Sequence, residues 1–437
     1  MKKAIRGLLL LTAFLPIVVI PSVLSPFLTG KTLVLRGILF IVALLATILF
    51  IQNHSSRTEV SERFRALIRQ PLTWALGAFL LILVISTLTA FDPYFAFFSD
   101  IVRQDGFLGI ITFYFLYIFL TLYFTKKDWT RFLLLTVPVS VVLFIVQAVQ
   151  ATKGMIRPDS LIGNPIFLSM YYAFTLYACG VIWARNRSTQ NGARGWLQAV
   201  AIIVALLAVL GILMTKSRGI LVGIAVGVVV SLLYIVIVGK NTYFGKAKFS
   251  VRKWAIGILV ITLLGGTGFY LTRHKTFWTH IPIAKTLVTI SSTDATTQAR
   301  IVNTKIALSG FSPAKEGWKR VLLGWGQDNF IFMWNKNYTP ELFGFDRGIL
   351  DRAHDKLVDV LVMQGIFGLL AYLSIWIAAF ALLSQIRIGR LEKTLLLFAL
   401  VSYFVANLFV FDTVTTYLVF FYILAYLSQS KLSNENI

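Results

Sequence analysis

The sequence predicts an all-α protein that crosses a membrane about twelve times. Hydrophobic residues make up 57% of the 437-residue chain, and the mean hydropathy is +0.79. Apolar runs of about twenty residues recur along the whole length, and a helix needs about that length to cross the hydrocarbon core of a bilayer. Only helices and closed barrels span a bilayer, and continuous apolar runs specify helices rather than alternating barrel strands. We therefore expect an all-α polytopic membrane protein.

The apolar runs divide the chain into residues 1–272 with nine spans, a long connection at 273–356, and residues 357–437 with three spans. The first run follows a basic stretch, as in a signal peptide. It lacks a small-residue cleavage site and is long enough to span, so we interpret it as an uncleaved helix. The predicted spans cover residues 6–28, 33–51, 72–90, 107–125, 132–150, 167–184, 196–214, 219–238, 254–272, 360–386, 394–411 and 413–429.

The placement of lysine and arginine predicts the orientation in the membrane. If the N-terminus is cytoplasmic, the segments on that side hold most of the 41 Lys and Arg residues, because cationic loops resist translocation. Both termini are then cytoplasmic, and residues 273–356 lie on the outer side of the cytoplasmic membrane. Topology thus explains much of the formal net charge of +23. We expect contact with the lipid bilayer and no nucleic-acid partner.

The long connection at 273–356 is predicted to be folded and to contain short helices. It is too rich in tryptophan for a disordered linker, and a loop of this length in a compact protein is often functional. Asp294 and Gly310 have the residue types of a helix start and stop around the sequence between them. A second helix is expected to run from about Asp351 into the tenth span. Cys179 is the only cysteine, so no disulfide links this connection.

Cations near the membrane plane are the most informative polar residues. Lys216 and Arg218, in TKSRG, separate two apolar runs by a very short turn, and an unpaired charge there is costly. Arg103, Arg157 and Arg300 fall on the same predicted side, and a guanidinium matches phosphate oxygens with a bidentate fork. Anchoring at the interface is the simpler interpretation for Lys216 and Arg157. For Arg218 the short turn favours a lipid-linked anion as partner.

Several common catalytic signatures are absent from the sequence. It contains no P-loop, no H-E-x-x-H motif and no cysteine cluster. Asp351, His354 and Asp355 carry metal-binding atoms, but three ligands within five helical residues cannot all point toward one ion. We therefore expect no metal, no cofactor and no nucleotide-driven chemistry.

Four stretches in order, TKSRGILVGIAVG, QARIVNTKIALSG, LLGWGQDNF and DRAHDKLVDVLVMQGIFGLLAYL, resemble the O-antigen ligase and polymerase superfamily of bacterial membrane proteins. The similarity extends upstream to FDPYFAFFSDIVRQDG and GNPIFLSMYY and so covers roughly residues 90–385. The resemblance implies a metal-independent, inverting glycosyltransferase. Such an enzyme moves a glycan from an undecaprenyl-diphosphate carrier to a glycan, lipid or protein acceptor outside the cytoplasmic membrane.

The resemblance also implies residue roles, with Arg218 and Arg300 binding the diphosphate and His354 acting on the acceptor. The chemistry agrees, because fixed arginines stabilise the charge that a departing diphosphate gains, and a neutral imidazole can take the proton of an incoming hydroxyl. On a helix through DRAHDKLVDVL, His354 would share the inward face with Leu357, Val358 and Leu361. Asp351, one turn earlier, would orient its ring.

Other residues complete the predicted substrate site. Without the resemblance, a polar cap at the membrane interface explains His354 equally well. Relatives commonly have Asn after this histidine, whereas this chain has Asp355. Trp325 is a candidate for stacking on a sugar, although the GWG stretch around it is expected to form a turn. The candidate substrate-binding residues are Arg103, Lys216, Asp351, Asp355 and Trp325.

A multi-pass transporter or flippase, for lipid-linked glycan or a small solute, is the alternative function. Transporters place ionisable groups or broken helices near the bilayer midplane. Here the charged residues fall near the predicted span ends, and Gln147 and Gln364 are the more conspicuous polar residues within spans. The sequence therefore favours a transferase, and it leaves the choice among ligase, polymerase and protein O-oligosaccharyltransferase open.

Overall fold

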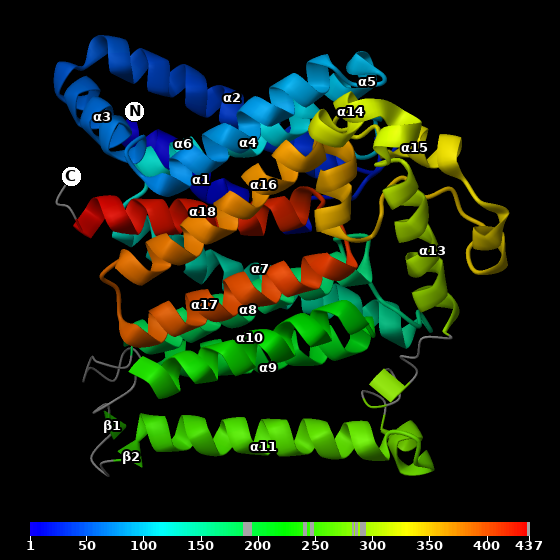
Figure 1. Ribbon diagram of the computed structural model, residues 1–437. Helices are drawn as coiled ribbons and strands as arrows, with labels where there is room; N and C mark the ends of the chain where they lie inside the picture. The colour runs from blue at the N-terminus through cyan, green and yellow to red at the C-terminus, as the bar shows by residue number, and fades with distance from the viewer. Residues whose placement is uncertain are drawn as a thin grey trace.

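The computed structural model describes the whole chain except residues 187–194, 239–242, 245–248, 282–283, 285–286, 289–293 and 435–437. The described residues are helical apart from loops and one short hairpin, in which β1 (Tyr243–Phe244) pairs antiparallel with β2 (Phe249–Ser250). Most of the long helices run side by side, and the short helices α13, α14 and α15 gather at one end of them (Figure 1). The predicted all-α class is confirmed.

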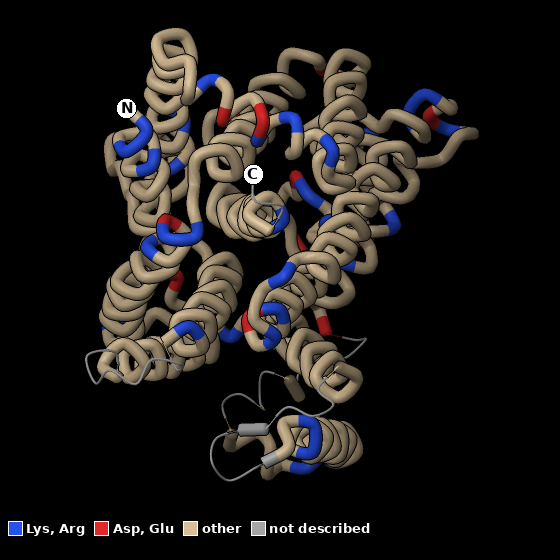
Figure 2. The backbone as a smooth tube through the Cα atoms, turned by 90° about the vertical axis from the view of Figure 1, so that its left-hand side faces the viewer, with Lys and Arg blue, Asp and Glu red and all other residues tan. Residues whose placement is uncertain are grey.

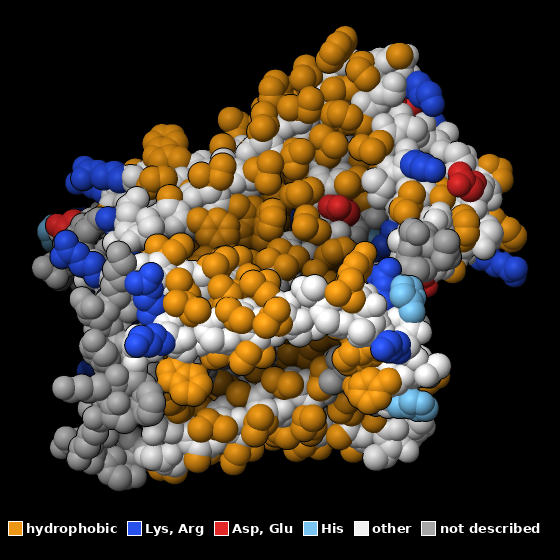
Figure 3. Space-filling view, turned by 60° about the horizontal axis from the view of Figure 1, so that its bottom comes forward, with side chains coloured by type: hydrophobic (Ala, Val, Ile, Leu, Met, Phe, Trp, Pro, Cys, Tyr) orange, Lys and Arg blue, Asp and Glu red, His pale blue; other side chains and the backbone are white. Residues whose placement is uncertain are grey.

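In the described part of the chain, nine helices are long and apolar enough to cross a membrane, and each coincides with a predicted span. On the face that Figure 3 shows, hydrophobic side chains form a broad belt, and Lys and Arg side chains lie on either side of it. The nine are α2 (Thr29–Gln52), α4 (Pro71–Leu88), α7 (Lys126–Thr152), α8 (Pro165–Asn186), α9 (Gly195–Thr215), α10 (Arg218–Val238), α11 (Val251–Thr272), α16 (Lys356–Gln385), and α17 (Arg390–Ala406) with its continuation η5 (Asn407–Phe409).

The other three predicted spans differ from these nine, so the count of about twelve is not confirmed. α6 (Phe107–Tyr123) is apolar but shorter, and α18 (Val414–Asn434) is buried along almost its entire length in the centre of the bundle. The single helix expected at 6–28 is wrong. α1 (Lys2–Leu11) continues only as the 3-10 helix η1 (Thr12–Ile17), which contains Pro16. Pro21 and Pro26 follow, and proline cannot donate the backbone hydrogen bond that a continuous helix needs.

Short helices account for most of the remaining chain. Two precede the long connection, α3 (His54–Leu67) and α5 (Pro93–Phe98). The connection itself contains η3 (Thr276–His280), α13 (Ala295–Ser309), α14 (Pro313–Leu323), α15 (Phe330–Asn337) and η4 (Pro340–Gly344). α13 has Asp294 at its N-cap and Gly310 at its C-cap, as predicted. That this connection lies on the outer side of the membrane stays a prediction.

The start of the tenth predicted span differs from expectation. α16 begins at Lys356 rather than near Asp351, because the carboxylate of Asp355 caps it by accepting the backbone N–H groups of Leu357 (2.9 Å) and Val358 (3.3 Å). His354 has a positive φ of 59° and lies outside the helix. The inward helical face predicted for His354 is therefore wrong.

Two glycines let the short helices dock directly on α16. Gly324 ends α14 with φ 77°, and Gly365 kinks α16 with φ 70°. A Cβ atom on either glycine would lie 2.3 Å from backbone atoms of the opposite segment. The backbone N–H groups of Trp325 and Gly326 donate to the carbonyls of Val362 and Met363, each at 2.9 Å. The GWG stretch is a bend bonded to α16 and not itself the expected turn, which follows at 327–329. It ties the short helices to the long ones.

Lysine and arginine gather at the helix ends. The end of the bundle that carries both termini shows many of them (Figure 2). This is the distribution on which the predicted orientation rests. The cytoplasmic location of the termini stays a prediction.

Candidate functional site

Arg218 joins α10 to the long connection. It is the first residue of α10, directly after the turn in which Lys216 has a φ of 51°. Its guanidinium lies 2.9 Å from a carboxylate oxygen of Asp294, the N-cap of α13. The Thr297 hydroxyl donates to the same oxygen at 3.1 Å. Burial raises the pKa of Asp294, but these partners outweigh burial and hold it below its usual range. The ion pair places Arg218 beside α13, which carries Arg300.

Arg300 lies in a cluster of positive charge. Burial lowers its pKa, and the charges of Arg218 and Arg157 lower it further, against the opposing effect of Asp294. Within the part of the chain that the structure describes, Arg300 forms no hydrogen bond or ion pair. Like charges repel one another, so an anion would stabilise this cluster, and a phosphate group matches the guanidinium geometry.

His354 packs its ring against Phe411, with ring centroids 5.2 Å apart. Burial lowers its pKa to about 4, and the charges of Arg300 and Arg103 add to this effect, while Asp351 and Asp346 oppose it. The imidazole is therefore neutral at pH 7. It forms no hydrogen bond with any other described residue. The structure thus brings His354 within electrostatic reach of Arg300.

Asp351 pairs with Arg103 instead of orienting the imidazole by a hydrogen bond. The guanidinium donates to both carboxylate oxygens, at 2.9 Å from Nη2 and at a shorter distance from Nε. It also lies over the Phe411 ring, 4.6 Å from the centroid. Burial raises the pKa of Asp351, but Arg352 and Arg103 outweigh it and keep the pKa low. Arg103 and His354 therefore share one aromatic support.

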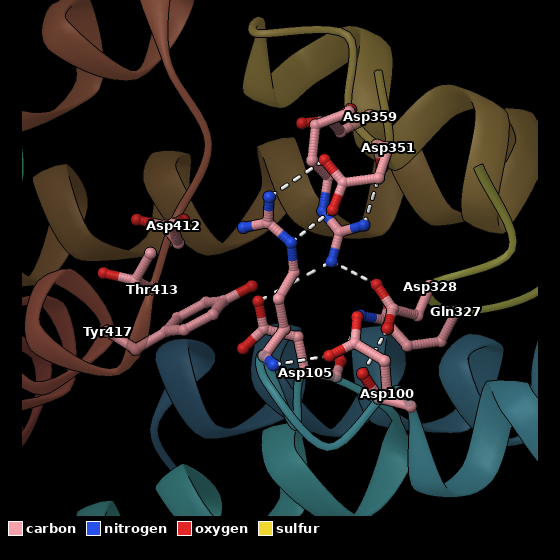
Figure 4. A network of polar contacts seen from close by, with 12 residues as sticks. Asp100, Asp105, Gln327, Asp328, Asp351, Asp359, Asp412, Thr413 and Tyr417 are labelled. Carbon is pink, nitrogen blue, oxygen red and sulfur yellow. Dashed lines mark hydrogen bonds and ion pairs between the residues drawn. The ribbon is translucent and has the colours of Figure 1, made fainter. Parts of the chain in front are cut away.

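A buried ionic network lies beneath the loop at 351–355, directly before α16, and the sequence analysis did not predict it (Figure 4). Arg352 is only 4% exposed and pairs with Asp328 and, at 3.6 Å, with Asp105. Burial lowers the pKa of Arg352, but the surrounding carboxylates raise it above its usual value. Burial raises the pKa of Asp105 to about 7, although Arg352 opposes this. Both aspartates lie in stretches used for the family resemblance, but no sequence pattern connected them to Arg352.

The backbone of the same loop is held as firmly as its side chains. The Asn303 amide donates to the carbonyl of Arg352 at 2.9 Å, and the backbone N–H of Ala353 donates to Asp359 at 2.6 Å. Asn303 comes from α13 and Asp359 from α16. The two residues before His354 are thereby fixed between the two helices.

A narrow cavity extends from this network between α6, α16 and α18. Its polar end includes Lys356, whose ammonium donates to the Tyr417 hydroxyl at 2.7 Å and lies 3.2 Å from Asp412. The volume open to the centres of water molecules is about 40 Å³, which accommodates a few waters. One carboxylate oxygen of Asp359 is buried there without a hydrogen-bond partner. The cavity therefore suits water rather than a whole sugar.

The remaining predicted residues occupy different surroundings. Trp325 is 2% exposed, and its indole N–H donates to the Gly310 carbonyl at 2.9 Å. This burial contradicts the expectation that Trp325 stacks on a sugar. Lys216 is exposed in the turn before Arg218, and Asp355 is engaged as the cap of α16. The described residues contain no group of three or more His, Cys, Asp or Glu that could hold a metal ion.

Together these features define a multi-pass membrane protein with an arginine-rich polar site at one end of its helices. The family model of O-antigen ligase matches residues 203–373, which include Arg218, Arg300 and His354. The chain therefore carries an O-antigen ligase domain, and the resemblance to the O-antigen ligase and polymerase superfamily is confirmed. The matched domain supports a membrane glycosyltransferase of the O-antigen ligase type. A search of curated proteins finds no significant match to this chain.

Proposed function

We propose that the protein transfers a glycan from undecaprenyl diphosphate to an acceptor on the outer side of the cytoplasmic membrane. One observation carries the proposal. Arg218, Arg300 and His354, which lie far apart in the sequence, share one polar region at the end of the bundle where the short helices gather. Both arginines and the histidine lie within the matched family region.

The arginines bind the donor diphosphate. The bond between the anomeric carbon of the sugar and the diphosphate oxygen breaks, and its electron pair stays with the diphosphate. Guanidinium groups already fixed in place stabilise the charge that develops on these oxygens. Arg218 also stands at the first turn of α10, where unpaired backbone N–H groups favour an anion.

His354 accepts the proton of the acceptor hydroxyl as its oxygen bonds to the anomeric carbon. Attack opposite to the leaving diphosphate inverts the configuration at that carbon and needs no metal. A base whose pKa is about 4 is neutral but weak. The bound diphosphate offsets the positive potential of Arg300, and this raises the pKa of His354 toward the working range. Donor binding therefore makes His354 a stronger base.

The ionic network positions this base. Arg352 lies two positions before His354, and its pairing with Asp328 and Asp105 fixes this part of the chain against the body of the protein. Arg103, held by Asp351 on the Phe411 ring, borders the same space. These residues leave the imidazole little freedom to turn away from the acceptor.

Arginine variants test the proposal. In purified protein reconstituted in nanodiscs, Arg218→Lys and Arg300→Lys should each reduce glycan transfer about 10- to 100-fold, because an ammonium cannot reproduce bidentate binding. Lys305→Gln is the matched control, since Lys305 is exposed on the same helix as Arg300. Full transfer by both lysine variants at normal protein level contradicts the proposal. In sealed proteoliposomes, movement of the intact lipid-linked glycan across the bilayer without transfer supports the transporter alternative.

A further inference from the structure

The helix α3, between α2 and α4, carries a basic surface that the proposed site does not use. α2 ends at Gln52 and α4 begins at Pro71, so α3 joins the ends of two helices that are long and apolar enough to cross a membrane. It lies at the end of the bundle that carries both termini, and it slants across the direction of the long helices (Figure 1). A helix in this place lies close to the level of the phospholipid headgroups.

One side of α3 is fixed against the protein. Its buried residues are Ser56, Ala66 and Leu67. The guanidinium of Arg63 donates to the carbonyl of Leu122, near the end of α6, at 2.9 Å and lies 3.2 Å from Glu59. The ammonium of Lys2 lies 2.6 Å from the other carboxylate oxygen of Glu59. This side therefore has its apolar residues buried and its charges paired.

The opposite side of α3 combines apolar and cationic side chains. Phe64 is 44% exposed, and Ile68, directly after the helix, is 42% exposed. Three exposed arginines accompany them, Arg57, Arg65 and Arg69. With about 3.6 residues per turn, Arg57, Phe64 and Ile68 lie along one strip of the surface, and Arg65 borders it. Large apolar side chains on a basic helix are favoured at the boundary between headgroups and acyl chains.

The exposed arginines of this surface have no partner on the protein. Within the part of the chain that the structure describes, the side chains of Arg57, Arg65 and Arg69 form no hydrogen bond or ion pair. Glu62 is the one exposed acidic side chain of α3. Figure 2 shows further Lys and Arg residues beside the N-terminus at the same end of the bundle. The surface therefore carries a positive charge that the described residues do not neutralise.

We propose that the exposed face of α3 binds anionic phospholipid headgroups. The guanidinium groups match the phosphate oxygens, while Phe64 and Ile68 reach the acyl chains. These two apolar side chains distinguish the surface from a site for a soluble anion. A purely topological role would need the charges alone, without an ordered helix that places apolar side chains between them. Lipid binding at α3 requires no glycan transfer, so this inference goes beyond the proposed function and does not rest on it.

The test compares an anionic with a zwitterionic lipid. Purified protein in non-ionic detergent micelles is titrated with fluorescent phosphatidylglycerol and with fluorescent phosphatidylcholine. Wild-type protein should prefer phosphatidylglycerol, and added salt should weaken this preference. Each cation near an anionic lipid contributes roughly fivefold in affinity. Combining Arg57→Gln, Arg65→Gln and Arg69→Gln should therefore weaken phosphatidylglycerol binding about 10- to 100-fold and leave phosphatidylcholine binding nearly unchanged.

The matched control removes three exposed charges from the opposite end of the bundle. It combines Lys305→Gln, Lys315→Gln and Lys319→Gln, on α13 and α14, and should keep the full preference. Combining Phe64→Ser with Ile68→Ser should weaken the binding of both lipids and keep the preference between them. Micelles have no sides, so a change of orientation in the cell does not affect these measurements.

The outcomes separate lipid binding from a topological role of the arginines. If wild-type protein shows no preference, or the triple arginine variant keeps it, the proposal is refuted and the arginines serve orientation alone. If the serine variant binds both lipids as tightly as wild-type protein, the site takes a soluble anion rather than a lipid. Should the triple variant fail to fold, the single arginine variants decide. Each should lose roughly fivefold in phosphatidylglycerol affinity, and three unchanged affinities would refute the proposal.

Discussion

The substitution His354→Gln separates catalysis from donor binding. Glutamine keeps a hydrogen-bonding side chain of similar length but cannot act as a titratable base. The imidazole is neutral at pH 7, because burial and the nearby arginines lower its pKa to about 4. The replacement therefore removes no charge from the donor site. Losing a general base typically costs about 10²- to 10⁴-fold in rate, so we expect that loss in transfer with near wild-type donor affinity.

Single-turnover kinetics measure the two effects separately. Purified protein in nanodiscs is loaded with fluorescent undecaprenyl-diphosphate-linked glycan, and donor affinity is determined before acceptor is added. His274→Gln is the control, because His274 is exposed beside η3, outside the site. If donor binding collapses while pre-bound donor is transferred at the normal rate, His354 belongs to the donor pocket and is not the general base.

Three further predictions concern pH, stability and topology. Because only the neutral imidazole accepts a proton, activity should be lost as pH falls through the pKa of His354. The value of kcat/KM reports the free enzyme and should fall near pH 4. The value of kcat reports the donor-bound enzyme and should fall at a higher pH, since bound diphosphate raises the pKa of His354. If kcat/KM and kcat fall at the same pH, bound diphosphate does not raise the pKa of His354. Arg352→Met leaves Asp328 and Asp105 buried without their cation and should destabilise the protein by about 3–5 kcal/mol, seen as a lower Tm in detergent; an unchanged Tm would contradict the network's role. Cys179 is buried, so a cysteine at the 74% exposed Ile349 should react with an impermeant maleimide while the cytoplasmic membrane is intact. Labelling only after lysis would place the long connection inside.

Features set by local physics could be predicted from the sequence. The nine long helices follow from runs of apolar residues, and α13 follows from Asp294 and Gly310 at its two ends. The first predicted span failed where prolines interrupt an apolar run, because hydropathy does not register a missing backbone donor. Hydropathy therefore locates membrane spans, whereas single residues decide whether the helix continues through each span.

Features set by long-range pairing could not be predicted. Asp351 and Asp355 are both aspartates, a residue type that caps helices. In the structure Asp355 caps α16, while Asp351 pairs with Arg103, 248 positions away, and Arg352 is buried. The cap at Asp355 leaves His354 outside the helix. Arg157 resembled a simple interfacial anchor because nothing local connects it to Thr215, whose carbonyl accepts its Nε–H. The sequence identifies the arginines and lysines near the membrane plane, but it does not show which residues pair with them.

Product analysis shows whether glycan transfer is coupled to the release of undecaprenyl diphosphate. Purified protein in nanodiscs is given undecaprenyl-diphosphate-linked glycan and acceptor, and each lipid product is quantified together with the glycosylated acceptor. We expect one undecaprenyl diphosphate to be released for each glycan transferred, and Arg300→Lys to release it only at a small residual rate. Release of undecaprenyl phosphate, or full consumption of donor without glycosylated acceptor, would contradict it.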